Sequence, residues 1–463
     1  MSFIFPYKSV PKDSKIILYG ASFVGEDYYY QILSTNYCSL VAMVDQKFDT
    51  PIRNDDGILL CDASKLPELE FDFIVLAVEL DRTAAKIKDF LISRGIAENK
   101  IIYANKGVEK GDVKLLPEKL LSDNIEPIEA DYISIAFGTT GGLGDYIVTL
   151  KVIDAILELY PNCKFHIYSA PNQFAFAKTI YGHHPAVAGI YDFFLYNSVA
   201  KQYDIAMWVT HFIRIDHFNK SKVIAHSDIL AKSIQKIIDE YDEYAGDVDN
   251  QFYNWFGRCK LWGLNRYTAL AHNGALLIND KRVKIYLNKE YEQKFSELGL
   301  KKYITINTGT GLIKIKTWAK EKFEELTAKI KAKYKDVEIV QIGGNHNIKI
   351  AGVDKYILGQ SMELTKYVLK GALAHVDCEG GLVHLATQLG TKCIVIGAPT
   401  PIWYYKYEEN EYILSDACNE CDGVRVFWNE KCVRGYDNPP CMESITVDKV
   451  LRCVDKVLGR IAK

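Results

Sequence analysis

The chain has 463 residues, which is more than one hydrophobic core usually supports, so we expect two or three domains. Its 56 basic and 59 acidic side chains give a net charge of −3, a balance that does not favour binding to nucleic acid. No apolar run approaches the roughly 18 residues that span a bilayer, and residues 1–15 lack the apolar core of a signal peptide. We therefore predict a soluble, cytoplasmic protein, in which contact with a membrane surface would need a local charged patch.

Residues 1–107 are predicted to form a small Rossmann-like α/β domain. One strand-like run ends in a turn with Gly20 and Gly25, and the next ends in Asp45. In a dinucleotide-binding unit such a turn holds the pyrophosphate and such an acid holds a ribose. Ser22 replaces the middle glycine of that pattern. We therefore favour a structural, oligomerising or vestigial role over nucleotide binding, and do not expect NAD(P) there.

A predicted linker over 108–130 leads into a second unit, residues 131–296. The linker segment is charged, contains two prolines and lacks sustained periodicity. Gly144 and Asp145 then follow a strand-like run and precede apolar residues at helical spacing. Asp145 is expected at a helix start, where a carboxylate either caps the helix or faces a ligand. The aromatic-rich residues 211–275 carry no motif that we can name.

The third predicted unit, residues 297–463, begins with groups suited to phosphate. Thr308 and Thr310 follow a strand-like run, and Lys316 lies just beyond them. Hydroxyls and an ammonium group after a strand are suitable partners for phosphate oxygens. The alternative for Lys316 is a solvated lysine among several others.

A second feature of this unit is the strand-to-helix turn at Glu379, Gly380 and Gly381, with His384 in the following helix. Glycine lets backbone N–H groups approach a ligand, and a helix N-terminus offers unpaired donors and a positive dipole end to an anion. The turn therefore predicts a diphosphate site, although many glycine turns of this kind serve the backbone alone. Asp377 is an alternative for the acidic role, and His384 could equally be a packed or capping histidine.

Together these motifs resemble the lipopolysaccharide heptosyltransferases of glycosyltransferase family 9, over roughly residues 131–463. Gly144-Asp145 stands where that family carries the Gly-Asp of its catalytic base, and Lys316-Thr317-Trp318 matches its Lys-x-Trp element, whose lysine contacts the donor phosphates. Residues 379–386 match its Asp-(Ser/Thr)-Gly-x-x-His-Leu-Ala element, which cradles the donor, with Glu and Gly at the first two positions. The spacing to His384 favours Glu379 over Asp377. The resemblance implies an α/β protein with the GT-B fold of two Rossmann-like lobes, preceded here by the third, small domain.

The resemblance also implies an inverting transfer of a heptose, with ADP-heptose as the expected donor and a surface glycan or a protein as acceptor. Asp145 would be the base. Lys316, the hydroxyls of Thr308 and Thr310 and the helix start at Gly380-Gly381 would stabilise the departing diphosphate, so no divalent cation is required. Two other functions stay open: a non-catalytic protein that binds sugar nucleotides, and an NAD-dependent oxidoreductase that uses the first domain. A homo-oligomer is also compatible with the sequence.

Four of the eleven cysteines lie together in the loop 418–441, at Cys418, Cys421, Cys432 and Cys441. Four thiolates suit a structural Zn²⁺ or iron site, although the spacing of the last pair is not a common zinc-finger gap. Reduced, unligated cysteines are the alternative, and a disulfide is a weaker one. A four-cysteine metal finger also occurs in the related heptosyltransferases that modify autotransporter proteins.

Overall fold

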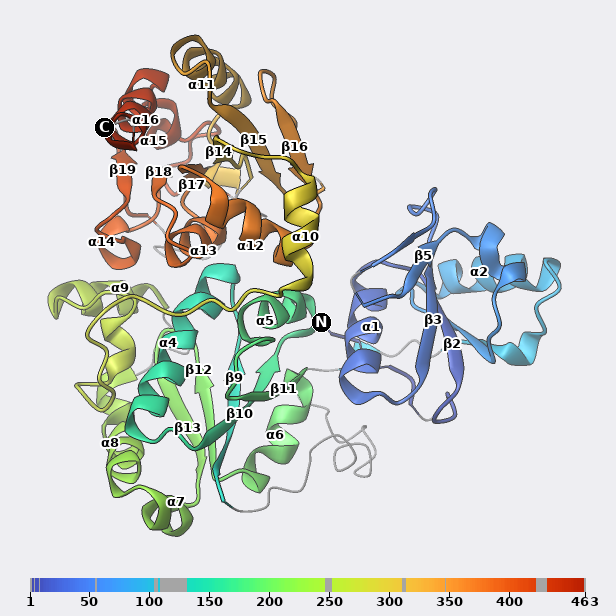
Figure 1. Cartoon of the computed structure of the whole chain (residues 1–463). Helices are drawn as coiled ribbons and strands as arrows, with labels where there is room; N and C mark the ends of the chain where they lie inside the picture. The colour runs from blue at the N-terminus through green and yellow to red at the C-terminus, as the bar shows by residue number, and fades with distance from the viewer. Residues whose placement is uncertain are drawn as a thin grey trace.

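A computed structural model describes residues 2–461 except 4, 8, 55, 104–106, 109–130, 246–251, 310–313, 346 and 422–430. Almost all of the predicted linker and Thr310 lie outside the described residues. The described chain forms three α/β units, each built on a largely parallel sheet (Figure 1). The α/β class with three Rossmann-like units is therefore confirmed. Below, the second and third units are called the N-lobe and the C-lobe.

The first unit has a sheet in which β4 is antiparallel and the other strands are parallel. In spatial order its strands are β4 (Ile52–Arg53), β5 (Leu59–Cys61), β3 (Ser39–Val44), β2 (Lys15–Tyr19), β6 (Phe73–Leu76) and β7 (Ile101–Ile102). Its other elements are α1 (Phe23–Thr35), η1 (Ala63–Glu68), α2 (Asp81–Ser93) and η2 (Glu98–Lys100). The short strands β1 (Ser2–Phe3) and β8 (Gly107–Val108) pair separately.

Helix α1 joins this first unit to the N-lobe. Its residues Tyr28 and Ile32 belong to a buried apolar cluster that also contains Tyr168 and Tyr196 of the N-lobe. Burial of such aromatic and aliphatic side chains supplies most of the favourable free energy at an interface of this kind. The two units therefore share one continuous core.

The N-lobe sheet is parallel except for its last strand. In spatial order its strands are β11 (Val187–Asp192), β10 (Cys163–Ser169), β9 (Ile133–Thr139), β12 (Ile205–Val209) and β13 (Ile213–Phe218). Its helices are α4 (Leu143–Leu159), η4 (Pro171–Gln173), α5 (Phe174–Tyr181), η5 (Phe193–Leu195), α6 (Tyr196–Val199), η6 (Ala200–Gln202), α7 (Lys220–His226), α8 (Asp228–Ala245), α9 (Phe252–Leu261) and η8 (Thr268–Ala271). Of the apolar positions that the helical spacing of α4 predicts as buried, Ile147, Leu150, Ile153 and Ile156 are fully buried and Leu157 is partly buried.

The C-lobe sheet is entirely parallel, and its central strands β14, β17 and β18 are buried throughout. Such strands are covered by helices on both faces, which explains the apolar sequence of β18, whereas β17 buries His375 and Asp377 in contact with one another. In spatial order the strands are β16 (Lys355–Leu358), β15 (Glu338–Gly343), β14 (Tyr303–Ile306), β17 (His375–Cys378), β18 (Cys393–Gly397) and β19 (Glu411–Leu414). The helices are α10 (Glu290–Glu297), η9 (Lys314–Lys316), α11 (Lys320–Lys333), α12 (Met362–Gly371), α13 (Gly381–Gln388), α14 (Ile402–Tyr405), α15 (Pro440–Glu443) and α16 (Val447–Ile461).

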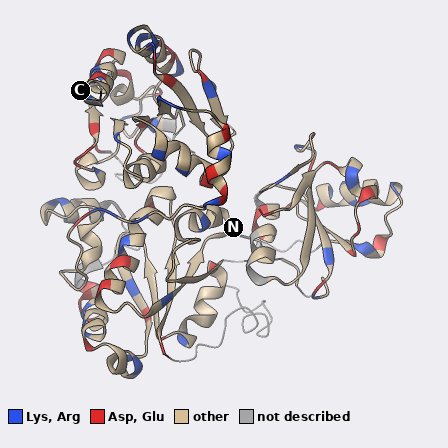
Figure 2. Cartoon of the chain, viewed as in Figure 1, with Lys and Arg blue, Asp and Glu red and all other residues tan. Residues whose placement is uncertain are grey.

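Acidic and basic residues are interspersed on all three units, in keeping with the small net charge (Figure 2). Among the described residues, every helix is either too short or too polar to cross a bilayer.

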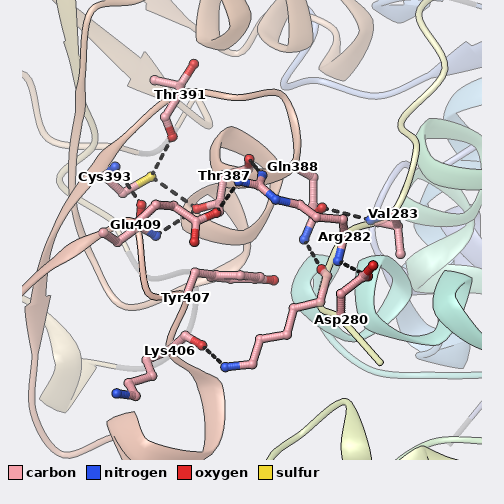
Figure 3. A network of polar contacts seen from close by, with 12 residues as sticks. Asp280, Arg282, Val283, Thr387, Gln388, Thr391, Cys393, Lys406, Tyr407 and Glu409 are labelled. Atoms are coloured by element: carbon pink, nitrogen blue, oxygen red, sulfur yellow. Dashed lines mark hydrogen bonds and ion pairs between the residues drawn. The ribbon is translucent and has the colours of Figure 1, made fainter. Parts of the chain in front are cut away.

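A crossing segment around Arg282 ties the two lobes together (Figure 3). On the N-lobe side, Lys151 of α4 forms an ion pair with Asp280 at 2.7 Å. On the C-lobe side, Arg282 donates from Nη1 to the carbonyl oxygen of Thr387 at 2.9 Å and pairs with Glu409 at 2.6 Å. Charged hydrogen bonds of this kind fix geometry well, so the crossing segment has a defined path between the lobes.

The starts of α4 and α13 meet where the lobes face one another (Figure 1). A Cβ atom on Gly144 would lie 2.7 Å from the ring of His384, and one on Gly381 would lie 2.7 Å from Cβ of Leu143. Two glycines therefore permit a close approach of the two helices, which any larger residue would prevent.

We expect Gly144→Ala to destabilise the docked lobes, because the added methyl group overlaps a histidine ring that its own hydrogen bonds hold in place. Overpacking of this kind costs roughly 1–3 kcal/mol, which thermal unfolding would record as a lower Tm. Gly459→Ala in α16 is the matched control, since nothing lies within 4 Å of its added Cβ. That control should keep or raise the Tm through helix propensity, and an equal Tm for both variants would contradict the packing argument.

Candidate active site

A cavity of about 280 Å³ lies between the lobes, and it brings together the predicted base and most of the predicted donor site. Its lining comes from the start of α4, from the turn before α13 and from isolated residues of both lobes. The lining residues are Gly142, Leu143, Gly144, Asp145, Val148, His211, Arg266, Lys316, Glu379, Gly380, Gly381, His384 and Tyr405. Segments far apart in the sequence therefore form one polar site.

Asp145 caps its helix and faces the cavity at the same time. It is the third residue of α4, and its Oδ2 accepts the backbone N–H of Gly142 at 2.9 Å. Its Oδ1 accepts a hydrogen bond from Nη2 of Arg266 at 3.2 Å. The side chain is 29% exposed, so a ligand can reach it. Capping and chemistry are thus compatible roles for this carboxylate.

Lys316 and Glu379 form an ion pair at 2.9 Å, and each side chain is only 9% exposed. Thr400 also donates to Glu379, at 3.0 Å. Burial raises the pKa of Glu379, but the charge of Lys316 and then the contact with His384 lower it more, so the net pKa lies well below its ordinary range. Glu379 is therefore a carboxylate that fixes the ammonium group of Lys316 at the cavity wall.

His384 is held from both sides. Its Nδ1 lies 2.7 Å from the hydroxyl of Tyr407, which in turn lies 2.7 Å from the hydroxyl of Tyr267 in the N-lobe. Its Nε2 lies 3.6 Å from Glu379. The ring is thus a packed, hydrogen-bonded wall of the cavity that also touches Gly144.

The glycines of the site differ in what surrounds them. A Cβ atom on Gly380 would meet only the carbonyl oxygen of Cys378, at 3.8 Å, so space lies open beside this residue. Gly381, by contrast, is needed for packing against Leu143. The open space at Gly380 adjoins the N-terminus of α13, where backbone donors attract an anion.

Two predicted positions, Thr308 and Asp377, stand apart from the cavity. The hydroxyl of Thr308 donates to the carbonyl oxygen of Ile348 at 3.2 Å and accepts from Gln341 at 3.1 Å, and Thr308 is not among the lining residues. Thr310 lies outside the described residues. Asp377 is buried and accepts two hydrogen bonds from Asn307, so Glu379 is the acid of this pair that lines the cavity.

The glycine turn of the first unit is closed by its own side chains. Oδ2 of Asp45 accepts the backbone N–H of Ala21 at 2.7 Å, and Lys47 bonds to the carbonyl oxygen of the same residue. A Cβ atom on Gly25 would lie 2.0 Å from the carbonyl oxygen of Gly20, so this glycine serves a tight turn. This arrangement favours the structural role, and nucleotide binding there stays a prediction.

All four cysteines of the loop 418–441 line one cavity of about 80 Å³. Cys432 and Cys441 are buried, while Cys418 and Cys421 are partly exposed. Among the described residues, however, no group of three or more His, Cys, Asp or Glu side chains has the geometry to hold a metal ion. The donor types therefore fit a metal site, and metal binding by these four cysteines stays a prediction.

Sequence reasoning missed Arg266, His211 and Tyr405, which also line the cavity. Each lies outside the motifs, and no local pattern marks it. Only the fold brings them to Asp145.

A family model described as C2185-like, N-terminal, matches residues 12–102, inside the first predicted domain. No curated protein sequence matches the chain. Solved structures do match it, and they include the kind of protein that the motifs resemble. A glycosyltransferase of family 9 from Veillonella parvula matches with 13% sequence identity and a TM-score of 0.48. The match covers 72% of this chain and 99% of that chain.

Two further matches come from Escherichia coli. The ADP-heptose lipopolysaccharide heptosyltransferase II has 10% identity, 72% of this chain and 100% of that chain covered, and a TM-score of 0.45. The iron-containing dodecameric glycosyltransferase TibC of an enterotoxigenic strain has 13% identity, 72% of this chain and 81% of that chain covered, and a TM-score of 0.47.

We expect Lys316→Met to cost roughly 3–5 kcal/mol of stability, because it leaves the buried carboxylate of Glu379 without its charge partner. The double variant Lys316→Met/Glu379→Gln should lose less than the single one, since it removes both charges. Chemical denaturation of the three proteins at pH 7 measures this difference, and equal losses for the single and double variants would contradict the pairing.

The loss of stability in Lys316→Met should depend on pH. The pKa of Glu379 is depressed in the folded chain, so its contribution to stability is complete above the ordinary value of 4.5 and is lost as the pH falls below it. The cost of Lys316→Met should therefore be smaller at pH 4 than at pH 7.

Proposed function

We propose that this protein is an inverting glycosyltransferase that takes a sugar from a nucleotide diphosphate donor without an obligatory divalent cation. The observation that carries the proposal is the cavity between the lobes. There Asp145 faces Lys316 and the N-terminus of α13. Such an arrangement supplies a base on one wall and charge stabilisation on the other, which sugar transfer requires.

In the proposed reaction, Asp145 removes the proton from an acceptor hydroxyl while that oxygen attacks the anomeric carbon of the donor. The bond between the anomeric carbon and the diphosphate breaks in the same displacement, so the configuration inverts. The departing diphosphate gains charge, which Lys316 and the backbone N–H groups at Gly380 and Gly381 stabilise. Glu379 and His384 shape this wall and orient Lys316.

The expected donor is ADP-heptose and the expected acceptor is a surface glycan or a protein. Both expectations rest on the resemblance of the sequence motifs to family 9 heptosyltransferases. Cytoplasmic location, contact with a membrane surface and assembly into a homo-oligomer likewise stay predictions.

The first experiment is a thermal-shift panel of ADP-, GDP- and UDP-sugars. A ligand that binds only the folded chain raises its stability by about 2.7 kcal/mol at a concentration of 100 times Kd. We expect a selective shift with ADP-sugars. No shift with any donor would contradict a donor site in this cavity.

The second experiment separates transfer from binding. Asp145→Asn should lower kcat by roughly 10²- to 10⁴-fold, the usual contribution of a general base, while the ADP-sugar shift is retained. Asp228→Asn is a matched control, because Asp228 is an acid in the first turn of α8 that lies outside the cavity. Unchanged turnover in Asp145→Asn would remove this residue from the mechanism. A donor shift without any transfer by the parent would favour a non-catalytic binding protein.

We further propose that the four cysteines at 418, 421, 432 and 441 bind a structural Zn²⁺ or iron ion. Support comes from their shared cavity and from the chemistry of four thiolates. Elemental analysis should find about one metal ion per chain, and Cys418→Ser/Cys421→Ser should abolish it and lower the Tm. Cys453→Ser in α16 is the control, since this cysteine does not line the cavity. Absence of metal from the parent protein would refute the site.

A further inference from the structure

Arg266 is a buried cation with an unusual set of contacts. Its side chain is 1% exposed, and Nη2 donates to Asp145. Within the described part of the chain, its Nε and Nη1 atoms are buried without a hydrogen-bond partner. A buried unpaired donor costs roughly 1–3 kcal/mol, and a buried ion pair is weak evidence for stability. Stability alone therefore does not explain this guanidinium group beside the cavity.

Tyr404 of the C-lobe is anchored inside the N-lobe. It lies on α14, is 1% exposed, and joins a buried cluster with Phe256 and Trp255 of α9. Its hydroxyl accepts from Nε1 of Trp255 at 3.0 Å and lies 3.1 Å from Nδ1 of His211. Its ring stacks on His211 with an angle of 11° between the planes. Two hydrogen bonds and ring packing thus fix Tyr404, a residue of the C-lobe, inside the N-lobe.

The same residue holds the backbone of Arg266. The carbonyl oxygen of Tyr404 accepts the backbone N–H of Arg266 at 2.9 Å. A continuous set of contacts therefore runs from the docked C-lobe through Tyr404 and Arg266 to Oδ1 of Asp145. The other oxygen of Asp145 accepts the backbone N–H of Gly142, the residue directly before α4.

We propose that Arg266 is a positioning residue that holds the Asp145 carboxylate in its working orientation, and that Tyr404 keeps Arg266 in place only while the lobes are docked. The inference rests on the proposed function, because it takes Asp145 as the base. Arginine suits this task, since it is always charged and its planar group directs N–H bonds in fixed directions. The base is then aligned only when the donor lobe is seated, which limits the reaction to the closed cavity.

Arg266→Gln should lower kcat by roughly 100-fold, the cost of a misplaced catalytic group, while the KM for the donor and the ADP-sugar thermal shift stay unchanged. In an Asp145→Asn background the same change should have no further effect, because Arg266 acts only through Asp145. Arg258→Gln is the matched control, since Arg258 stacks on Trp262 and does not line the cavity. An unchanged kcat, or losses that multiply in the double variant, would overturn the proposal.

Tyr404→Phe provides a test that does not depend on the folding of an Arg266 variant. It removes only the hydroxyl that contacts Trp255 and His211, so kcat should fall below that of the parent. Tyr334→Phe is the control, because it also removes one hydroxyl bond, to Asp455, far from the cavity. Equal kcat values for the two variants would overturn the role of Tyr404.

A crystal structure separates this inference from the proposed function. If the parent transfers no sugar from any donor, the proposed function fails, and the position of Asp145 in Arg266→Gln decides the inference. We expect the carboxylate to leave its present rotamer in that variant. A carboxylate that stays in place would show that Arg266 does not position it.

Discussion

The close contact between the starts of α4 and α13 is the constraint on which the site depends. Because Gly144 has no side chain, the ring of His384 can lie against it, and the two lobes meet at their helix N-termini. Asp145 and Arg266 come from the N-lobe, whereas Lys316, Glu379 and the N-terminus of α13 come from the C-lobe. The cavity of about 280 Å³ and its mixed chemistry are therefore products of docking.

The charges of the site are arranged in two pairs, one from each lobe. Asp145 is paired with Arg266 in the N-lobe, and Glu379 with Lys316 in the C-lobe. Taking such groups out of water is costly, so pairing and additional hydrogen bonds are needed for them to remain charged. Because each pair contains one positive and one negative side chain, their charges cancel. The N-terminus of α13 therefore supplies the remaining attraction for an anion. A bound diphosphate would contact the ammonium group of Lys316 while Lys316 stays paired with Glu379.

The sequence allowed the fold to be predicted where local patterns decide it. The buried face of α4 and the apolar runs of the parallel strands follow from periodicity and composition. Positions that follow a strand, such as Asp145 in the first turn of α4 and Glu379 directly after β17, could also be found, because parallel strands place their following turns on one edge of the sheet. The hydroxyl of Thr308 could not be oriented, since its partners Gln341 and Ile348 are more than thirty residues away.

Long-range contacts explain what sequence reasoning missed. Arg266 and Tyr404 belong to segments without a motif, and their roles exist only because α14 of one lobe enters the aromatic cluster of the other. The glycines present the same problem in another form. A glycine that admits a ligand and a glycine that admits a neighbouring helix look alike in sequence, and here Gly380 and Gly381 stand side by side with different surroundings.

The first unit extends this argument from the site to the whole chain. In its glycine turn, Asp45 and Lys47 bond to the backbone N–H and carbonyl oxygen of Ala21, so the acid that would hold a ribose is already engaged. Its apolar surface on α1 continues into the core of the N-lobe, and Lys178 of the N-lobe pairs with Asp56 at 2.5 Å. A domain that uses both its apolar face and its charges to hold its neighbour has the properties of a scaffold. Its contacts support the lobe that carries Asp145. The cavity itself is formed by the contacts between the N-lobe and the C-lobe.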